Sequence, residues 1–447
     1  MTAAAARTLA LAALIALGSP GPVPAQEAAG GALPFAFQHY RLRNGLRVVL
    51  SANPQLPLVT VAVAYRAGTL YERPGQEGLA FLLENLMFQG SENVGPFQHI
   101  GFVQKVGGEL NATTTHDRTL FYETLPSNHL ALALWLESDR MKTMDVSPGT
   151  IERTRAGLLE EHEARLASDP YLASFAEFDG LLYADALYGH PLIGGGAGLR
   201  QLAGEDIREF HRTHYVPNNA VLCIVGRIDI PRTRELVARY FDTVPPGSDV
   251  PSPRQPVFTR GSDAVERFAA VRAPGAGFHM GFRFFPLQPG EAEALRMLEY
   301  VLLEGRTSRL RHRLLRKDLT ARYLSGALEK RLSIAALKVF ALSSNASSAE
   351  RSQRIILAEI DRLKANEISQ DEIARVRRRF KMDYLERLST NLGKALRLID
   401  AALAGDGLDG LGGELAEHLR VTPAEIQAVV GKYFTPQNRV VVGLGPR

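Results

Sequence analysis

The sequence predicts an α+β fold made of two homologous halves. The first observation behind this expectation is an internal repeat, because the helix, aromatic residue, turn and apolar strand of 205–226 recur over 424–445. Asn219 returns as Asn438, an offset of 219 residues (438−219) that holds through the repeat. The second observation is that strand-like runs precede amphipathic helices in each half. This order is typical of helices packed on one face of a sheet.

The expected elements follow from hydrophobic patterning. Apolar runs predict strands over Leu46–Leu50 and Val59–Tyr65 in the first half and over Gly277–Phe285 in the second. A segment dense in proline, glycine and serine, 245–258, cannot continue a helix or a central strand and predicts the linker between the halves. Apolar positions that recur every three or four residues predict helices over Leu130–Met141, Thr150–Leu166, Ala292–Leu303 and Ser348–Ala365.

The N-terminus has the pattern of an export signal. Arg7 precedes a short apolar run, Leu9–Leu17, and small residues stand before Gln26, where cleavage is expected. The run is too short to span a bilayer, and no cysteine lies near the cleavage point to carry a lipid anchor. We therefore expect a periplasmic protein with a signal peptide (1–25), an N-terminal domain (26–244), the linker (245–258) and a C-terminal domain (259–447).

Composition and charge narrow the class of protein. With 447 residues, 45% of them hydrophobic, the chain can bury more than one core. The net charge of +4 is small, and acidic residues flank the basic run Arg375–Arg379, which predicts a solvated helix face and no nucleic-acid partner. The single cysteine, Cys223, is expected in the core, and His211 and His214 are expected on the surface of the repeat helix.

The segment 78–90 has the frame of the inverted zinc-binding motif H-x-x-E-H, but it lacks both histidines. Phe81 and Asn85 stand at the histidine positions, and Glu84 stands at the position of the general base. These positions, i, i+3 and i+4, share one face of a helix. A phenyl ring cannot ligate a metal and a carboxamide is a poor substitute for imidazole, so we expect no metal and no cofactor in this chain.

Further blocks resemble the insulinase/pitrilysin-type (inverzincin) metallopeptidases, in the branch of the mitochondrial processing peptidases. The resemblance covers nearly the whole mature chain in register. It implies that each domain is an antiparallel-rich sheet covered on one face by helices, and that the two domains form half of a clamshell chamber. The blocks that carry it are Arg66–Thr69, Tyr71–Glu72, Gly107–Thr114, Trp135–Met141, Gly189–Gly194 and the Pro-Asn-Asn turn at 217–219.

The resemblance also assigns site residues. It puts Glu161, 76 positions after Asn85 (161−85), at the place of the third zinc ligand, although its charged surroundings fit a solvated glutamate equally well. The strand that pairs with bound peptide backbone in the family carries Gly108, Asn111, Ala112 and Thr113 here.

The second half matches a further pair of family residues. Arg316 and Tyr323, seven positions apart, match an arginine and a tyrosine that act on substrate across the chamber from the zinc site. A guanidinium can hold a substrate carbonyl, and a phenol can donate to a developing oxyanion. The alternative is an ordinary surface arginine and a core tyrosine.

These features predict a non-catalytic subunit of an exported heterodimeric zinc endopeptidase. The partner would be an insulinase-type subunit with an intact H-x-x-E-H motif, which would hold the zinc, and unfolded peptides would be the substrates. Two alternatives remain open. One is a stand-alone peptide-binding or scaffold protein. The other, which the phenyl ring of Phe81 disfavours, is a residual peptidase with an atypical metal site made of Glu84, Glu161 and His162.

Overall fold

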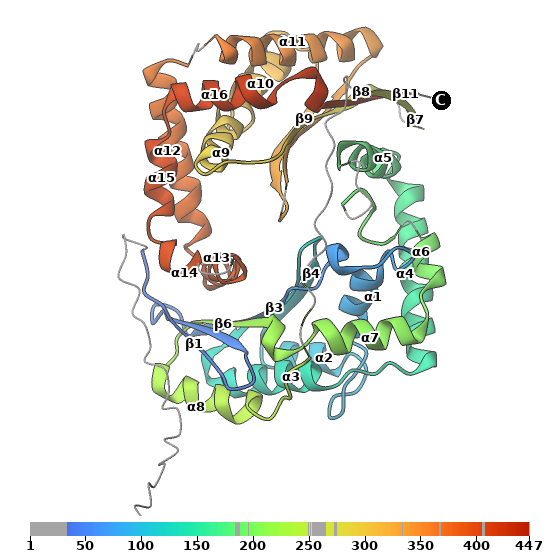
Figure 1. The fold of residues 1–447 in the computed structure, drawn as a ribbon, viewed down its shortest axis with the longest axis vertical. Coiled ribbons are helices and arrows are strands. Elements are labelled where there is room, and N and C mark those ends of the chain that lie inside the picture. The colour runs from blue at the N-terminus through green and yellow to red at the C-terminus, as the bar shows by residue number, and fades with distance from the viewer. Residues whose placement is uncertain are drawn as a thin grey trace, which may run out of the picture.

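Two β-sheets, one in each half of the chain, form the framework of the molecule (Figure 1). The structure is a computed structural model. It describes residues 34–183, 188–194, 196–248, 250, 252, 265–271, 275–332, 334–365, 368–404 and 407–446. The expected signal peptide and most of the expected linker lie outside these ranges, so the domain boundaries remain predictions.

Sheet A, in the first half, has the strand order β1-β2-β6-β3-β5-β4. Its neighbouring strands are antiparallel except for β2 and β6, which run parallel. The strands are β1 (Gln38–Arg41), β2 (Arg47–Ala52), β3 (Leu58–Tyr65), β4 (Glu109–Thr114), β5 (Thr119–Pro126) and β6 (Ala220–Gly226).

Sheet B, in the second half, has the order β7-β11-β8-β10-β9. Taken in this order, its strands correspond to β2-β6-β3-β5-β4 of sheet A, and β1 has no counterpart. Here too only one pair, β7 and β11, is parallel. The predicted repeat thus extends through the whole sheet, and β2, β3 and β8 match the three predicted strands to within two residues. The strands are β7 (Val265–Val271), β8 (Ala276–Phe284), β9 (Tyr323–Lys330), β10 (Ala335–Ser343) and β11 (Arg439–Pro446).

The helices repeat as the strands do, and the four predicted helices correspond to α3, α4, α9 and α11. The first half contains α1 (Leu79–Leu86), α2 (Gln98–Lys105), α3 (Leu130–Lys142), α4 (Pro148–Ser168), α5 (Leu172–Tyr183), α6 (Ala197–Gln201), α7 (Gly204–His214) and α8 (Ile230–Phe241). The second contains α9 (Glu291–Leu302), α10 (Arg309–His312), α11 (Ala346–Lys364), α12 (Gln370–Arg387), α13 (Asn391–Leu403), α14 (Gly407–Gly410), α15 (Glu414–Arg420) and α16 (Pro423–Tyr433). A shift of 219 residues brings α5 onto α13 and α7 onto α16, since 172+219 is 391 and 204+219 is 423.

Each sheet packs on the helices of its own half, as predicted, and a helix from the other half packs on its opposite face. Along β3, Val61 and Val63 face the helices of the first half, while Ala62 and Ala64 face α13. The opposite face of sheet B receives α5, whose Phe178 joins a buried cluster with residues of β10 and β11. In Figure 1, α13 reaches down to β6 and α5 lies beside β8 and β11. The two halves therefore exchange helices reciprocally.

Polar contacts reinforce both exchanged helices. Arg47 on β2 donates to the carbonyl of Ala402 at 2.6 Å, and Arg66 donates to that of Leu403 at 2.7 Å. On the other side, Lys338 of β10 pairs with Asp179 of α5 at 2.5 Å. Because these groups lie at the edge of apolar clusters, they fix the orientation of each helix as well as its position.

Three minor expectations can be compared with the structure. Cys223 is fully buried, as predicted, and Arg375 and Arg379 lie on an exposed face of α12. The surface position expected for His214 is wrong, since only 5% of this residue is exposed. It follows Phe210 by four positions on the core-facing side of α7, and the two ring centroids lie 4.4 Å apart. None of the described helices is long and apolar enough to cross a membrane.

His279 of β8 makes the contact between α5 and sheet B sensitive to acid. Its ring lies between those of Phe178 and Phe340, and its Nε2 is 2.9 Å from the Ser174 hydroxyl. Burial and the nearby ammonium of Lys338 lower the pKa of His279 from 6.5 to about 3. The unfolded chain thus binds a proton below pH 6.5 that the folded chain excludes. The free energy of unfolding should therefore decrease as the pH is lowered from 6.5 toward 3, by up to about 1.4 kcal/mol per pH unit from this group.

We expect His279→Phe to make the free energy of unfolding less dependent on pH between 6.5 and 4. Ser174 keeps a second partner, the carbonyl of Tyr171 at 2.7 Å, so the cost at pH 7 should be small. Urea unfolding at pH 7 and pH 5 measures the effect. Replacement of the exposed His312 by asparagine serves as the control, and equal slopes in wild type and His279→Phe would contradict the expectation.

Candidate functional site: the degenerate metal helix, the edge strand and the Arg/Tyr pair

Helix α1 is held at its N-terminus by the buried carboxyl group of Glu72. Gly78, with a φ of 96°, turns the chain into the helix, and a Cβ there would meet the carbonyl of Ile193 at 2.7 Å. The side chain of Glu72 accepts from the amides of Gly78 at 3.1 Å and Ala80 at 2.8 Å. This contact satisfies amides that the first helical turn leaves unpaired, and it fixes the helix that carries Phe81, Glu84 and Asn85.

The two side chains at the histidine positions are engaged with the protein itself. Phe81 is partly buried and packs against the core of the first half. Asn85 donates from Nδ2 to the carbonyl of Phe81 at 2.9 Å, so its amide folds back onto its own helix. Phe81 has no ligand atom, and Asn85 offers only a carboxamide oxygen, a poor substitute for the imidazole nitrogen of a zinc site.

Glu84 points to the edge strand of sheet A. Its carboxyl lies beside the hydroxyl and backbone of Thr114, the last residue of β4, and its Oε2 is buried without a partner among the described residues. Burial raises the pKa of Glu84 above its ordinary value, while the contacts with Thr114 lower it. The carboxyl therefore has a neighbour in the fold that does not depend on zinc.

Glu161 does not complete a metal site. It lies on α4 with 53% of its side chain exposed, and its carboxylate pairs with Arg165 on the next turn at 2.5 Å. Among the described residues, the only group that brings three potential ligand atoms together is His99, Glu123 and Glu137, so Glu84, Glu161 and His162 do not converge. The residues at the zinc-site positions do not fit a zinc ion.

The predicted peptide-binding strand is the open edge of sheet A. β4 pairs only with β5 in the described sheet, and Asn111 and Thr113 are exposed along it. Gly108 lets the strand approach β5, because a Cβ there would lie 2.8 Å from that of Leu125. The amide of Ala112 is already bonded to Oδ1 of Asn111 at 2.8 Å. A peptide that pairs with this amide would displace the Asn111 side chain, a form of edge protection.

Arg316 and Tyr323 are both exposed and come from neighbouring elements of the second half. Arg316 lies in a short π-helical stretch, Arg313–Lys317, and forms no ion pair with a described residue. Tyr323 opens β9 with 50% of its surface exposed, so it is not the core tyrosine of the alternative reading. Its ring lies 5.9 Å from that of Phe340, which in turn lies 5.0 Å from Phe175 of α5. One side of the Tyr323 ring thus contacts Phe340, while half of the residue's surface is exposed.

Two family models match this chain in succession. The model described as insulinase (peptidase family M16) matches residues 47–175, and the model described as peptidase M16 inactive domain matches residues 201–380. Together they cover most of both sheets and their helices. The chain belongs to the insulinase (M16) peptidase family.

Individual proteins match this chain over almost its full length. The chain is 25% identical to zinc protease PqqE of Helicobacter pylori over 412 residues, which cover 91% of this chain and 92% of that protein. The crystal structure of a protease from Helicobacter pylori has a TM-score of 0.86 and 23% identity, and the match covers 92% of this chain and all of that one. The periplasmic protease PqqL from Escherichia coli has a TM-score of 0.75 and 17% identity, covering 96% of this chain but 48% of that one.

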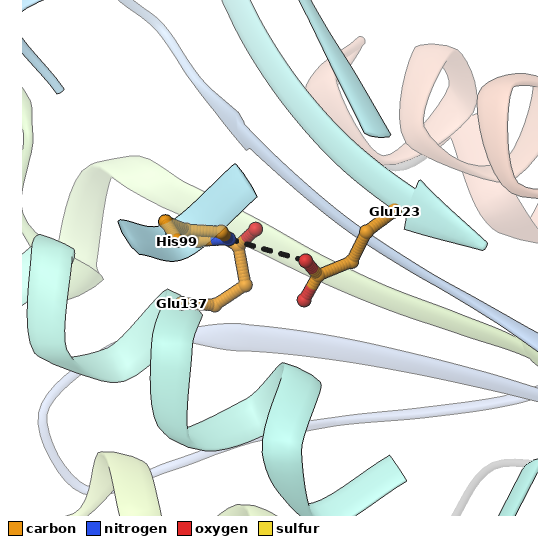
Figure 2. A group of neighbouring side chains, drawn as sticks. All are labelled: His99, Glu123 and Glu137. Atoms are coloured by element: carbon orange, nitrogen blue, oxygen red, sulfur yellow. Dashed lines mark hydrogen bonds and ion pairs between the residues drawn. The ribbon is translucent and has the colours of Figure 1, made fainter. Parts of the chain in front are cut away.

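The first half of the chain also contains a buried polar cluster, between α2, β5 and α3, that the sequence did not predict. Figure 2 shows His99 of α2, Glu123 of β5 and Glu137 of α3 turned toward one another. One potential ligand atom from each residue lies within 4.8 Å of the others, and His99 Nε2 is 3.1 Å from Glu123 Oε2. The three residues come from separate elements, so no local spacing in the sequence reveals them.

Arg140 brings a positive charge to this cluster through its contact with Glu137. Its guanidinium donates to both oxygens of Glu137, at 2.9 Å in the bond from Nε, and stacks over the ring of Phe121 at 4.2 Å. Burial lowers the pKa of His99 to about 3 and raises that of Glu123 to about 8, which favours a neutral imidazole beside a protonated carboxyl. In the structure the cluster is thus a buried ion pair, Glu137 with Arg140, beside a hydrogen-bonded pair, His99 with Glu123.

Proposed function

We propose that this chain is the non-catalytic subunit of an exported heterodimeric zinc endopeptidase. It supplies half of the peptide chamber, the strand β4 as a peptide edge, and Arg316 and Tyr323 as groups that act on substrate bound to the partner. The partner is an M16 chain with an intact H-x-x-E-H motif, and the zinc belongs to that partner. Unfolded peptides are the substrate class, since an open strand edge recognises backbone more than side chains.

The observation that carries the proposal is the contrast between the two candidate sites. At the metal positions, Phe81 is partly buried against the core and Asn85 is bonded to its own helix, so zinc chemistry has no support there. Arg316 and Tyr323, in contrast, are exposed and make no described polar contact that would explain them as structural residues. A chain that lacks the metal ligands but presents the substrate-facing pair fits a supporting subunit.

The comparisons supply two further supports. PqqE and PqqL are named as proteases, and PqqL as periplasmic, which agrees with the export signal expected at residues 1–25. Nearly all of this chain corresponds to 48% of PqqL, so the larger protein has room for a second unit of this size. Pairing of this chain with a second M16 chain would assemble two units of this size from two polypeptides.

A stand-alone peptide-binding protein is the second candidate. The open edge of β4 favours it, because strand addition needs neither zinc nor a catalytic partner. A residual peptidase that uses Glu84, Glu161 and His162 has no support in the arrangement of these side chains.

Metal analysis combined with a fluorogenic peptide assay tests the proposal. The mature chain is purified alone and after co-expression with an intact-motif M16 chain from the same source. We expect less than a tenth of an equivalent of zinc and no turnover from the chain alone, and stoichiometric zinc with turnover from the pair.

Each other outcome points to a different function. Zinc and turnover in the chain alone would refute the proposal and restore the residual-peptidase reading. Peptide binding by the chain alone, with no complex formed on co-expression, would favour the stand-alone binding protein.

A further inference from the structure

Leu319 has a backbone conformation that leucine rarely adopts. Its φ is 50°, in the left-handed region, where a Cβ crowds the following carbonyl. Apart from glycines, only Phe97 shares a positive φ within the described part of the chain. Glycine would adopt this conformation without strain, so the side chain at position 319 needs another explanation.

The residues on both sides of Leu319 are fixed and impose this conformation. The amide of Asp318 donates to the carbonyl of Arg313 at 2.8 Å, and its carboxylate accepts from the same arginine's Nε at 2.7 Å. Thr320 is buried, and its carbonyl accepts from the Ser343 hydroxyl at 2.7 Å. The strain is thus held by the surrounding structure, as is common at ligand-contact positions.

The side chain of Leu319 contributes little to the hydrophobic core. It is 72% exposed, more than any other large apolar residue among those described. It lies three positions after Arg316 and four before Tyr323, in the connection between the two elements that carry them. Tyr323 is also the exposed end of a row of aromatic rings that continues through Phe340. The segment 316–323 thus carries an exposed arginine, an exposed leucine and an exposed tyrosine within eight residues.

We propose that Leu319 is a specificity-determining residue that packs against a large apolar side chain of the peptide held by Arg316 and Tyr323. The inference rests on the proposed function and adds a substrate class to it: peptides with leucine, phenylalanine or tyrosine at one position near the cleaved bond. The rigid, strained loop holds the leucine in place before peptide binds. Contact with peptide then removes from water the apolar surface that the free subunit exposes.

The test uses Leu319→Gly in the assembled heterodimer. A set of fluorogenic peptides carries phenylalanine or alanine at one position at a time, and kcat/KM is measured for each. The wild type should prefer phenylalanine at one position, and Leu319→Gly should reduce that preference about tenfold, the effect of partly burying one leucine side chain. The melting temperature of the variant should stay equal or rise, because glycine relieves the strain.

The chain offers a matched control in Phe97. This residue also has a positive φ, of 58°, and is 55% exposed, but it lies in the first half at the start of α2. Phe97→Gly should likewise keep or raise the melting temperature, and it should leave the peptide preference unchanged.

Three results would overturn the inference. They are an unchanged phenylalanine preference in Leu319→Gly, an equal loss in Phe97→Gly, and failure of Leu319→Gly to form the heterodimer, which would assign the leucine to the partner. A wild-type heterodimer that cleaves no peptide would instead refute the proposed function, so the two failures are distinguishable.

Discussion

Replacing Arg316 by alanine is expected to lower kcat/KM of the assembled heterodimer about 100-fold, because the guanidinium that holds the substrate carbonyl is lost. The side chain is exposed and forms no ion pair with the described residues, so its loss should not affect folding or assembly. The melting temperature of the subunit and the elution volume of the complex should match the wild type. Steady-state kinetics with a fluorogenic peptide measures the effect.

Tyr323→Phe separates the hydroxyl from the ring. The phenyl group keeps its contact with Phe340, so only the donor is lost, and kcat should fall about tenfold or more. Arg322→Ala, an exposed change beside Tyr323, serves as the control and should leave kcat unchanged. Wild-type turnover in both Arg316→Ala and Tyr323→Phe would remove the catalytic role assigned to the pair.

Replacing Arg140 by methionine is expected to cost about 3–5 kcal/mol of the free energy of unfolding, because it leaves the buried Glu137 without its counter-ion. Both residues are almost fully buried, and the guanidinium also covers the ring of Phe121. The neighbouring His99 does not supply a positive charge in its place, because burial lowers its pKa to about 3. Urea denaturation at pH 7 should show the loss as a lower midpoint with an unchanged slope.

The double variant Glu137→Leu with Arg140→Met provides the control for this effect. It removes both charges and fills the space with apolar groups, so it should recover most of the lost stability. A double variant no more stable than Arg140→Met alone would show that packing, and not the unpaired charge, determines the loss.

The sequence predicted the repeat and the strand-and-helix order because both follow from local patterns. The turn at 217–219 and its copy at 436–438 are set by proline and asparagine, and the strands by short apolar runs. The continuous run Val59–Tyr65 indicates a strand buried on both faces. It does not say which helix covers the second face, and α13, some 330 residues away (391−59=332), could not be assigned to it.

The site assignments rest on two different kinds of sequence signal, and the roles given to these residues stay predictions. Motif spacing located Phe81, Glu84 and Asn85 on one helix, and family likeness pointed to Arg316 and Tyr323. The strain at Leu319 was beyond reach, because a backbone angle imposed by Asp318 and Thr320 leaves no trace in residue type. The surface position expected for His214 was wrong because the residue lies one helical turn after Phe210, on the side of α7 that faces the core.

The reciprocal placement of α5 and α13 gives this single chain the construction of a swapped dimer. Each half completes the other's sheet with its own helix, as two copies of a protein do when they exchange equal arms about a two-fold axis. Parting the halves would expose the backs of both sheets to water in the same event. The two halves should therefore unfold in one transition and move as one body. A chamber built from two such chains is then expected to open at the interface between the polypeptides.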